Sequence, residues 1–105
     1  MQDPILRVDV RSDAGSGVTV ALAGELDIAT APQFRLRADE IVRDDGDVRV
    51  DCSELAFADS SGLDVLLRLS KALQEQQRRL VLANVRPIVR QAMDLLRLTD
   101  VVELE

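Results

Sequence analysis

The 105-residue chain contains no histidine, no tryptophan and no tyrosine, and it has a single cysteine, Cys52. Without histidine, the commonest metal ligand and catalytic base is missing, which excludes Ser/His/Asp and Cys/His catalysis. One cysteine cannot form an internal disulfide or a cysteine-rich zinc site. We therefore expect no catalytic residue, no metal and no cofactor, and we assign Cys52 no function.

Aromatic residues and positive charge are also scarce. Phe34 and Phe57 are the only aromatic residues, so the chain offers no platform on which bases could stack. Nineteen acidic residues against thirteen basic ones give a net charge of -6, which opposes binding to phosphate backbones. We expect no nucleic-acid partner, and we expect the arginines, Arg78 and Arg79 among them, to lie on solvated helix faces.

Long apolar segments are missing as well. No stretch approaches the ~18 apolar residues of a membrane-spanning helix, and Met1–Pro4 is not a basic region followed by an apolar segment. We expect a cytoplasmic protein with no membrane span. The length and the 47% content of hydrophobic residues suit one domain, spanning residues 1–105, with an aliphatic core.

Alternating patterns and short apolar runs predict five strands. Residues 6–10 and 18–23 alternate between apolar and other side chains around a glycine-containing turn, which predicts an antiparallel hairpin. The other runs of strand length are Val48–Cys52, Leu80–Ala83 and Val101–Leu104. We expect a loop between Cys52 and the helix that follows it.

Apolar residues at helical spacing predict three helices. The first should begin at Thr30, with its hydroxyl and Gln33 forming a capping box, and should end with Gly46 as its C-terminal cap. The others should span about 63–77 and 87–96. The element order predicts an α/β fold: a mixed central sheet with an N-terminal antiparallel hairpin followed by βαβα units, and helices packed on the sheet.

One segment, Asp51–Leu63, contains a strand end, a polar turn and a helix start. Asp59, Ser60 and Ser61 can cap backbone N–H groups, and Gly62 lets the backbone approach a neighbour closely. A helix N-terminus also favours negative charge, and strand-to-helix loops lie at the ligand-binding edge of α/β sheets. On these residues alone a helix cap is the simpler interpretation, and an anion site with a serine open to a kinase is the alternative.

The segment closely resembles the motif of the bacterial anti-sigma factor antagonists of the STAS family. The resemblance rests on Asp51, Ser53, Leu55, Phe57, Asp59, Ser60, Ser61, Gly62 and Leu63. Residues 24–27 with Thr30 resemble a second region of that family, and the element order agrees over nearly the whole chain. The resemblance implies the STAS fold, with Ser60 as the phosphorylated residue and Ser61 as a neighbour that helps to cap the helix.

The resemblance also implies partners. In this family the unphosphorylated antagonist binds an anti-sigma factor that is also a serine protein kinase, which frees a sigma factor. Phosphorylation, here at Ser60, ends the interaction, and a serine phosphatase restores it; ATP and Mg²⁺ belong to the kinase. The partner-binding residues implied are Glu25, Asp27, Thr30, Asp59, Ser61 and Gly62. From the residues themselves, Glu25 and Asp27 are equally consistent with solvated acids at a strand end, and Thr30 with a helix cap.

Two other functions remain open. A STAS subunit of a transporter or lipid-trafficking complex would bind a nucleotide-binding partner, with phosphorylation absent or secondary. The intact segment Asp59–Gly62 favours the antagonist, because the phosphorylation switch needs that serine. A small enzyme with Ser60 as nucleophile is the third possibility, but the chain lacks histidine and a Gly-x-Ser-x-Gly sequence.

Overall fold

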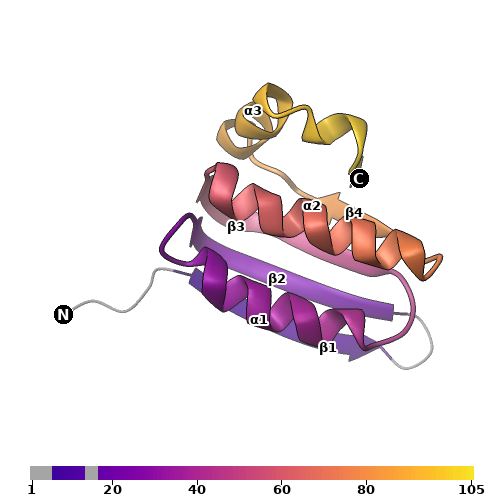
Figure 1. The fold of residues 1–105 in the computed structure, drawn as a ribbon. Coiled ribbons are helices and arrows are strands. Elements are labelled where there is room, and N and C mark those ends of the chain that lie inside the picture. Colours follow the sequence, from indigo (N-terminus) through magenta and orange to yellow (C-terminus); the bar gives the residue numbers. More distant parts are fainter. Residues whose placement is uncertain (1–5, 14–16) are drawn as a thin grey trace.

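A mixed sheet of five strands forms the frame of the computed structural model, which describes residues 6–13 and 17–105. The strand order follows the chain, β1-β2-β3-β4-β5. β1 and β2 are antiparallel, and every later neighbour pair is parallel (Figure 1). The predicted α/β fold with its N-terminal hairpin is confirmed. The strands are β1 Leu6–Asp13, β2 Gly17–Leu26, β3 Val48–Ala58, β4 Leu80–Ala83 and β5 Glu103–Leu104.

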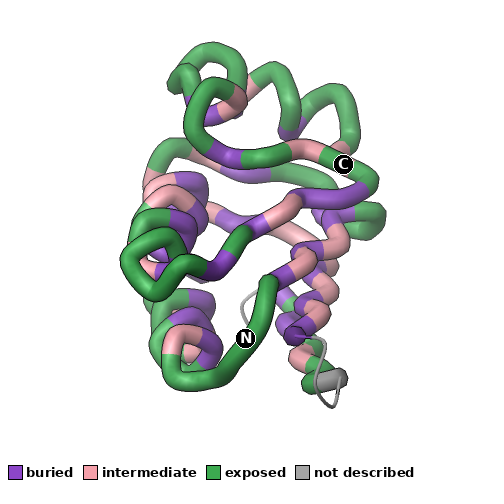
Figure 2. The backbone as a smooth tube through the Cα atoms, turned by 90° about the vertical axis from the view of Figure 1, so that its right-hand side faces the viewer, coloured by how far each residue is buried: buried purple, intermediate pink, exposed green. Residues whose placement is uncertain are grey.

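Three α-helices connect the parallel strands: α1 Ala31–Val42, α2 Ser60–Glu75 and α3 Pro87–Leu95, and a 3₁₀ turn, η1 Leu98–Asp100, follows α3. α1 and α2 lie side by side across one face of the sheet, and α3 lies on the far side of α2 from α1 (Figure 1). Figure 2 shows buried residues on strands and helices alike. The largest buried side chains come from both layers and include Leu22, Phe34, Leu55, Leu66 and Met93.

β3 is longer than the sequence predicts, because it continues to Ala58 where we expected a loop after Cys52. Two register shifts interrupt its pairing with β2, and the strand keeps pairing beyond them. Its buried residues in this part are Cys52, Leu55 and Ala58, three positions apart rather than two. A strand with such irregularities loses the period of two, so alternation alone does not identify it.

The predicted start of α1 at Thr30 is confirmed, but the predicted capping box and the predicted C-terminal cap are wrong. Thr30 occupies the N-cap position but makes no side-chain cap hydrogen bond, and Gln33 donates instead to the carbonyl of Leu6 at 3.1 Å. At the other end Arg43 is the C-cap residue, and Gly46 lies further along, in the turn before β3, with φ of 84°. The glycine therefore serves the turn rather than the helix end.

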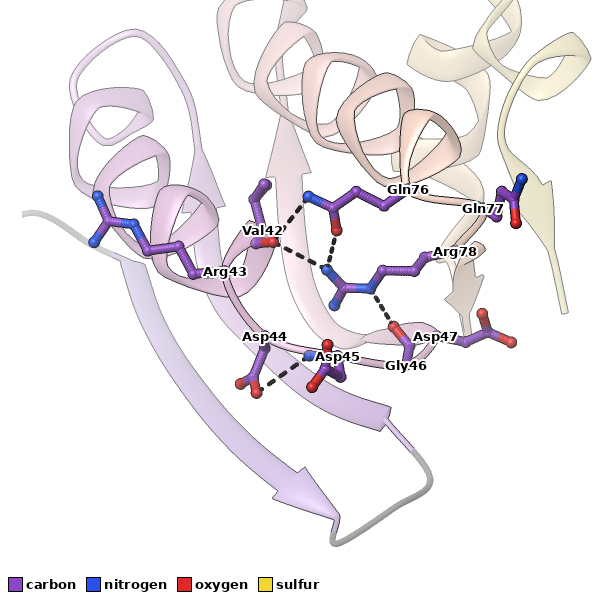
Figure 3. A pocket seen from close by; sticks show the side chains of 9 residues that line it. All are labelled: Val42, Arg43, Asp44, Asp45, Gly46, Asp47, Gln76, Gln77 and Arg78. Carbon is purple, nitrogen blue, oxygen red and sulfur yellow. Dashed lines mark hydrogen bonds between the residues drawn. The ribbon is translucent and has the colours of Figure 1, made fainter.

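Arg78 contradicts the expectation of a solvated arginine, because only 7% of it is exposed. Figure 3 shows its guanidinium directed into the turn that follows α1. Nε donates to the carbonyl of Gly46 at 2.6 Å, and Nη1 donates to the carbonyl of Val42 at 3.1 Å. Nη1 also bonds the amide oxygen of Gln76, and Nη2 bonds the carbonyl of Ile41. Arg78 thus adds hydrogen bonds to carbonyls at the end of α1 and in the turn that follows it.

Candidate functional site

The candidate site begins where β3 ends and α2 starts. Asp59 is extended, with φ of -110° and ψ of -177°, and its Oδ1 accepts a hydrogen bond from the backbone N–H of Gly62 at 3.0 Å. This is the geometry of a helix N-cap, so the predicted capping role of Asp59 is confirmed. Ser60, the first residue of α2, is exposed, and Ser61 is half-buried. The helix start therefore presents one exposed serine.

Asp59 also joins the ends of two strands. Its backbone N–H donates to the carbonyl of Leu26, the last residue of β2, at 3.1 Å. Its second carboxylate oxygen accepts from the N–H of Ile28 at 3.3 Å. The loop after β2 and the start of α2 are consequently held together, and Ser60 lies beside their junction.

Gly62 is buried against the end of β2. A Cβ atom added at this position would lie 2.4 Å from the carbonyl oxygen of Leu26 and 2.5 Å from its Cγ. Neither distance is compatible with a real side chain, so the predicted close approach of the backbone at Gly62 is confirmed. The glycine sets how near the start of α2 lies to β2.

The loop after β2 is held by Asp27 and Thr30. The Oδ1 atom of Asp27 accepts from the N–H groups of Ala29 and Thr30, at 2.9 and 3.1 Å. The Thr30 hydroxyl donates to the carbonyl of Glu25 at 2.8 Å and accepts from the N–H of Asp27 at 2.9 Å. Only 2% of Thr30 is exposed, so it positions the loop from within, whereas Glu25 and Asp27 are half-exposed.

Two exposed apolar side chains near the junction were not among the predicted site residues. Ile28 is 75% exposed and Phe57, which pairs with Glu25 across β2 and β3, is 41% exposed. The available signal for Ile28 was a large apolar residue in the short segment between β2 and α1. It borders a shallow hollow of about 300 Å³ between the starts of α1 and α2, lined by Ile28, Ala31, Pro32, Arg35, Ser61 and Asp64.

A second acid of the motif, Asp51, secures the middle of β3. The backbone N–H of Ser53 and the side-chain amide of Asn84 both bond its Oδ1, at 3.0 and 3.1 Å, and they lower the pKa of the Asp51 carboxyl. Arg86 donates through Nε to the carbonyl of Ser53 at 2.8 Å. These contacts tie β3 to the loop that leads into α3.

The described residues give little support to a reactive thiol, a metal site or a membrane-spanning helix. Burial raises the pKa of the Cys52 thiol to about 12, so the sulfur stays protonated at neutral pH and is a poor nucleophile. Within residues 6–13 and 17–105, no group of three or more acidic or cysteine side chains could hold a metal ion. None of the helices in this part of the chain is long and apolar enough to cross a membrane.

Comparison with known proteins agrees with this geometry. Residues 7–105 match the sequence profile of the STAS domain. The chain belongs to the STAS family. Over 101 residues this STAS domain is 26% identical to the anti-sigma-B factor antagonist of Listeria monocytogenes, covering 95% of this chain and 89% of that protein.

Solved structures agree in fold. The STAS domain matches the anti-sigma factor antagonist SpoIIAA in its unphosphorylated form with a TM-score of 0.80 and 23% identity, covering 94% of this chain and 88% of the other. It matches Bacillus SpoIIAA in the phosphorylated form with a TM-score of 0.73 and 22% identity, covering 94% and 91%. The same fold has therefore been described for both forms of SpoIIAA.

Proposed function

We propose that this STAS domain is an anti-sigma factor antagonist and not an enzyme. In its unphosphorylated form it binds an anti-sigma factor that is also a serine protein kinase, and so frees a sigma factor. Phosphorylation of Ser60 ends the binding, and a serine phosphatase reverses the modification. The protein would act in the bacterial cytoplasm.

The observation that carries this proposal is the exposed Ser60 at the first position of α2, directly after the cap Asp59. A kinase needs an accessible hydroxyl, and Ser60 supplies one at the start of a capped helix. Ser61 is half-buried and lines the hollow beside α1, which makes it the poorer acceptor. The kinship with the Listeria antagonist, and the existence of a phosphorylated SpoIIAA, support an antagonist that is controlled by phosphorylation.

The surroundings of Ser60 suit a docking surface that phosphate would disrupt. Ile28 and Phe57 offer exposed apolar area, and Glu25 and Asp27 offer half-exposed negative charge. We therefore retain Glu25, Asp27, Asp59 and Ser61 as partner contacts, with Thr30 and Gly62 shaping the surface from beneath. A basic partner surface would complement the acidic groups.

A phosphate on Ser60 would act through local electrostatics. It adds about -1.5 to -2 charge at neutral pH, and the helix N-terminus tolerates that charge in the free protein. In the complex the same group must lose water beside Asp59, where a loss of ~3 kcal/mol would weaken binding on the order of a hundredfold. The switch thus needs no change in the fold.

Incubation with ATP and the anti-sigma kinases of the same organism tests the assignment. Intact-mass analysis should find one phosphate on the wild type and on Ser61→Ala, and none on Ser60→Ala. Circular dichroism checks that all three proteins are folded. A phosphate that persists in Ser60→Ala and disappears in Ser61→Ala would overturn the choice of acceptor, and no phosphate on any folded form would overturn the switch.

A further inference from the structure

The outer edge of β1 is the longest unpaired edge of the sheet. Among the described residues, no strand pairs with the side of β1 that faces away from β2. The hydrogen bond from Gln33 to the Leu6 carbonyl lies at one end of the strand. A long edge of this kind is a template for pairing with another chain.

The side chains of β1 alternate in charge as well as in polarity. Leu6 and Val8 are buried beneath the helices and Val10 is half-buried, while Arg7, Asp9 and Arg11 are exposed. Since successive residues of a strand point to opposite faces, the exposed three lie in a row on the face turned away from α1. Along that row the charges run positive, negative, positive.

We propose that β1 pairs antiparallel with β1 of a second copy of this chain, with the two-fold axis at Val10. In this register Asp9 lies opposite Arg11 of the partner subunit, and Arg11 lies opposite Asp9 of the partner subunit. A register centred on Asp9 would instead oppose like charges. Opposite charges in directly facing positions stabilise a strand pair and like charges weaken it. The alternation is therefore complementary to itself under two-fold symmetry.

The apolar residues favour the same register. Val10, packed against the core but half-exposed at the edge, lies opposite its symmetry mate and is covered by it. This register pairs residues 7–13 of β1, whereas a register centred on Val8 pairs only residues 6–10 of the strand. Because each chain carries a charge of -6, long-range repulsion opposes association. At physiological salt this repulsion is screened beyond about 8 Å, so the facing charge pairs determine whether the two strands associate.

Charge exchange tests the pairing through sedimentation equilibrium. Asp9→Arg and Arg11→Asp should each weaken self-association at least about tenfold relative to wild type, since either change creates two like-charge contacts. The double variant Asp9→Arg/Arg11→Asp should restore it. An equimolar mixture of the two single variants should form a heterodimer, because each new charge then faces its opposite. Lys71→Glu on the exposed side of α2 controls for net charge.

A disulfide at the two-fold axis gives an independent test. Oxidised Val10→Cys should form a covalent dimer, because facing residues of a hydrogen-bonded pair lie about 5.5 Å apart, within disulfide range. The native Cys52 is buried and should not compete, and Lys71→Cys is the exposed control. A wild type that is monomeric at all concentrations, an Arg11→Asp variant that dimerises as tightly as the wild type, or equal crosslinking at both positions would overturn the proposal. None of these outcomes bears on phosphorylation of Ser60.

Discussion

At Gly62 the usual effect of glycine in a helix is reversed. Replacing a helical glycine by alanine normally stabilises a helix by up to about 1 kcal/mol. Here the new Cβ would lie 2.4 Å from the Leu26 carbonyl oxygen, so β2 and α2 would have to separate. We predict that Gly62→Ala destabilises the protein by about 1 to 3 kcal/mol in urea unfolding. Ser61→Ala, at the neighbouring half-buried position, should change stability by less than about 0.5 kcal/mol, and an equal loss in both variants would contradict the steric argument.

Asp59 combines a helix cap with a negative charge, and substitution can separate the two. Asparagine caps a helix as well as aspartate does through its one oxygen, but its amide nitrogen cannot accept from the N–H of Ile28, so Asp59→Asn should lose only this exposed contact, about 0.5 kcal/mol. Asp59→Ala should lose about 1 kcal/mol, since Gly62 and Ile28 lose their acceptor. Chemical denaturation measures the free energy of unfolding of the two variants. Equal losses would show that the charge of Asp59, and not its cap, matters for stability.

The buried thiol of Cys52 gives stability a dependence on alkaline pH. Its pKa is raised from 9.0 to about 12 in the folded chain, chiefly by burial. As the pH rises, the Cys52 thiol loses its proton in the unfolded chain before it does so in the folded chain. The contribution of the buried thiol to the free energy of unfolding is therefore complete below about pH 9 and is lost as the pH rises towards 12. We predict that Cys52→Ala loses stability less steeply across this range, by up to about 1.4 kcal/mol per pH unit. Urea unfolding at several pH values measures the slopes, and identical slopes would contradict the prediction.

At the scale of elements, one arginine joins the end of α1 to the start of β4. Arg78 bonds carbonyls of the α1 end and the following turn, whereas its neighbour Arg79 is exposed and pairs with Glu103. We predict that Arg78→Ala costs about 2 to 4 kcal/mol, because the carbonyls of Ile41, Val42 and Gly46 each lose a donor and a buried side chain is removed. Arg79→Ala should cost less than about 1 kcal/mol. Thermal unfolding of the two variants measures these losses of stability. Similar losses in both would show that Arg78 is not the structural link.

The same elements show what periodicity reveals and what it misses. The hairpin and the central turns of α1 and α2 follow from regular spacing of apolar residues, and the structure has them where predicted. The extension of β3 to Ala58 and the burial of Arg78 do not follow from spacing. Both depend on contacts with distant parts of the chain: irregular pairing with β2 and carbonyls left free by α1. The residues that neighbour a position in the sequence do not predict such distant contacts.

At the scale of the whole molecule, the motif that predicted the site is largely a set of structural contacts. Asp59 and Gly62 hold α2 against β2, and Asp51 holds β3 to the loop before α3. Sequence reasoning located this region because capping residues and glycine have recognisable local chemistry. It did not find Ile28, since the exposure of an apolar side chain depends on the assembled fold. Ser60 lies exposed beside these contacts, as do Ile28 and Phe57.

We propose that phosphate on Ser60 weakens partner binding without altering the fold. Calorimetric titration of the cognate anti-sigma factor with the unphosphorylated and the phosphorylated protein tests it most directly. We predict an affinity about a hundredfold lower for the phosphorylated form, from a loss of ~3 kcal/mol at the interface. Equal affinities for the two forms would contradict it.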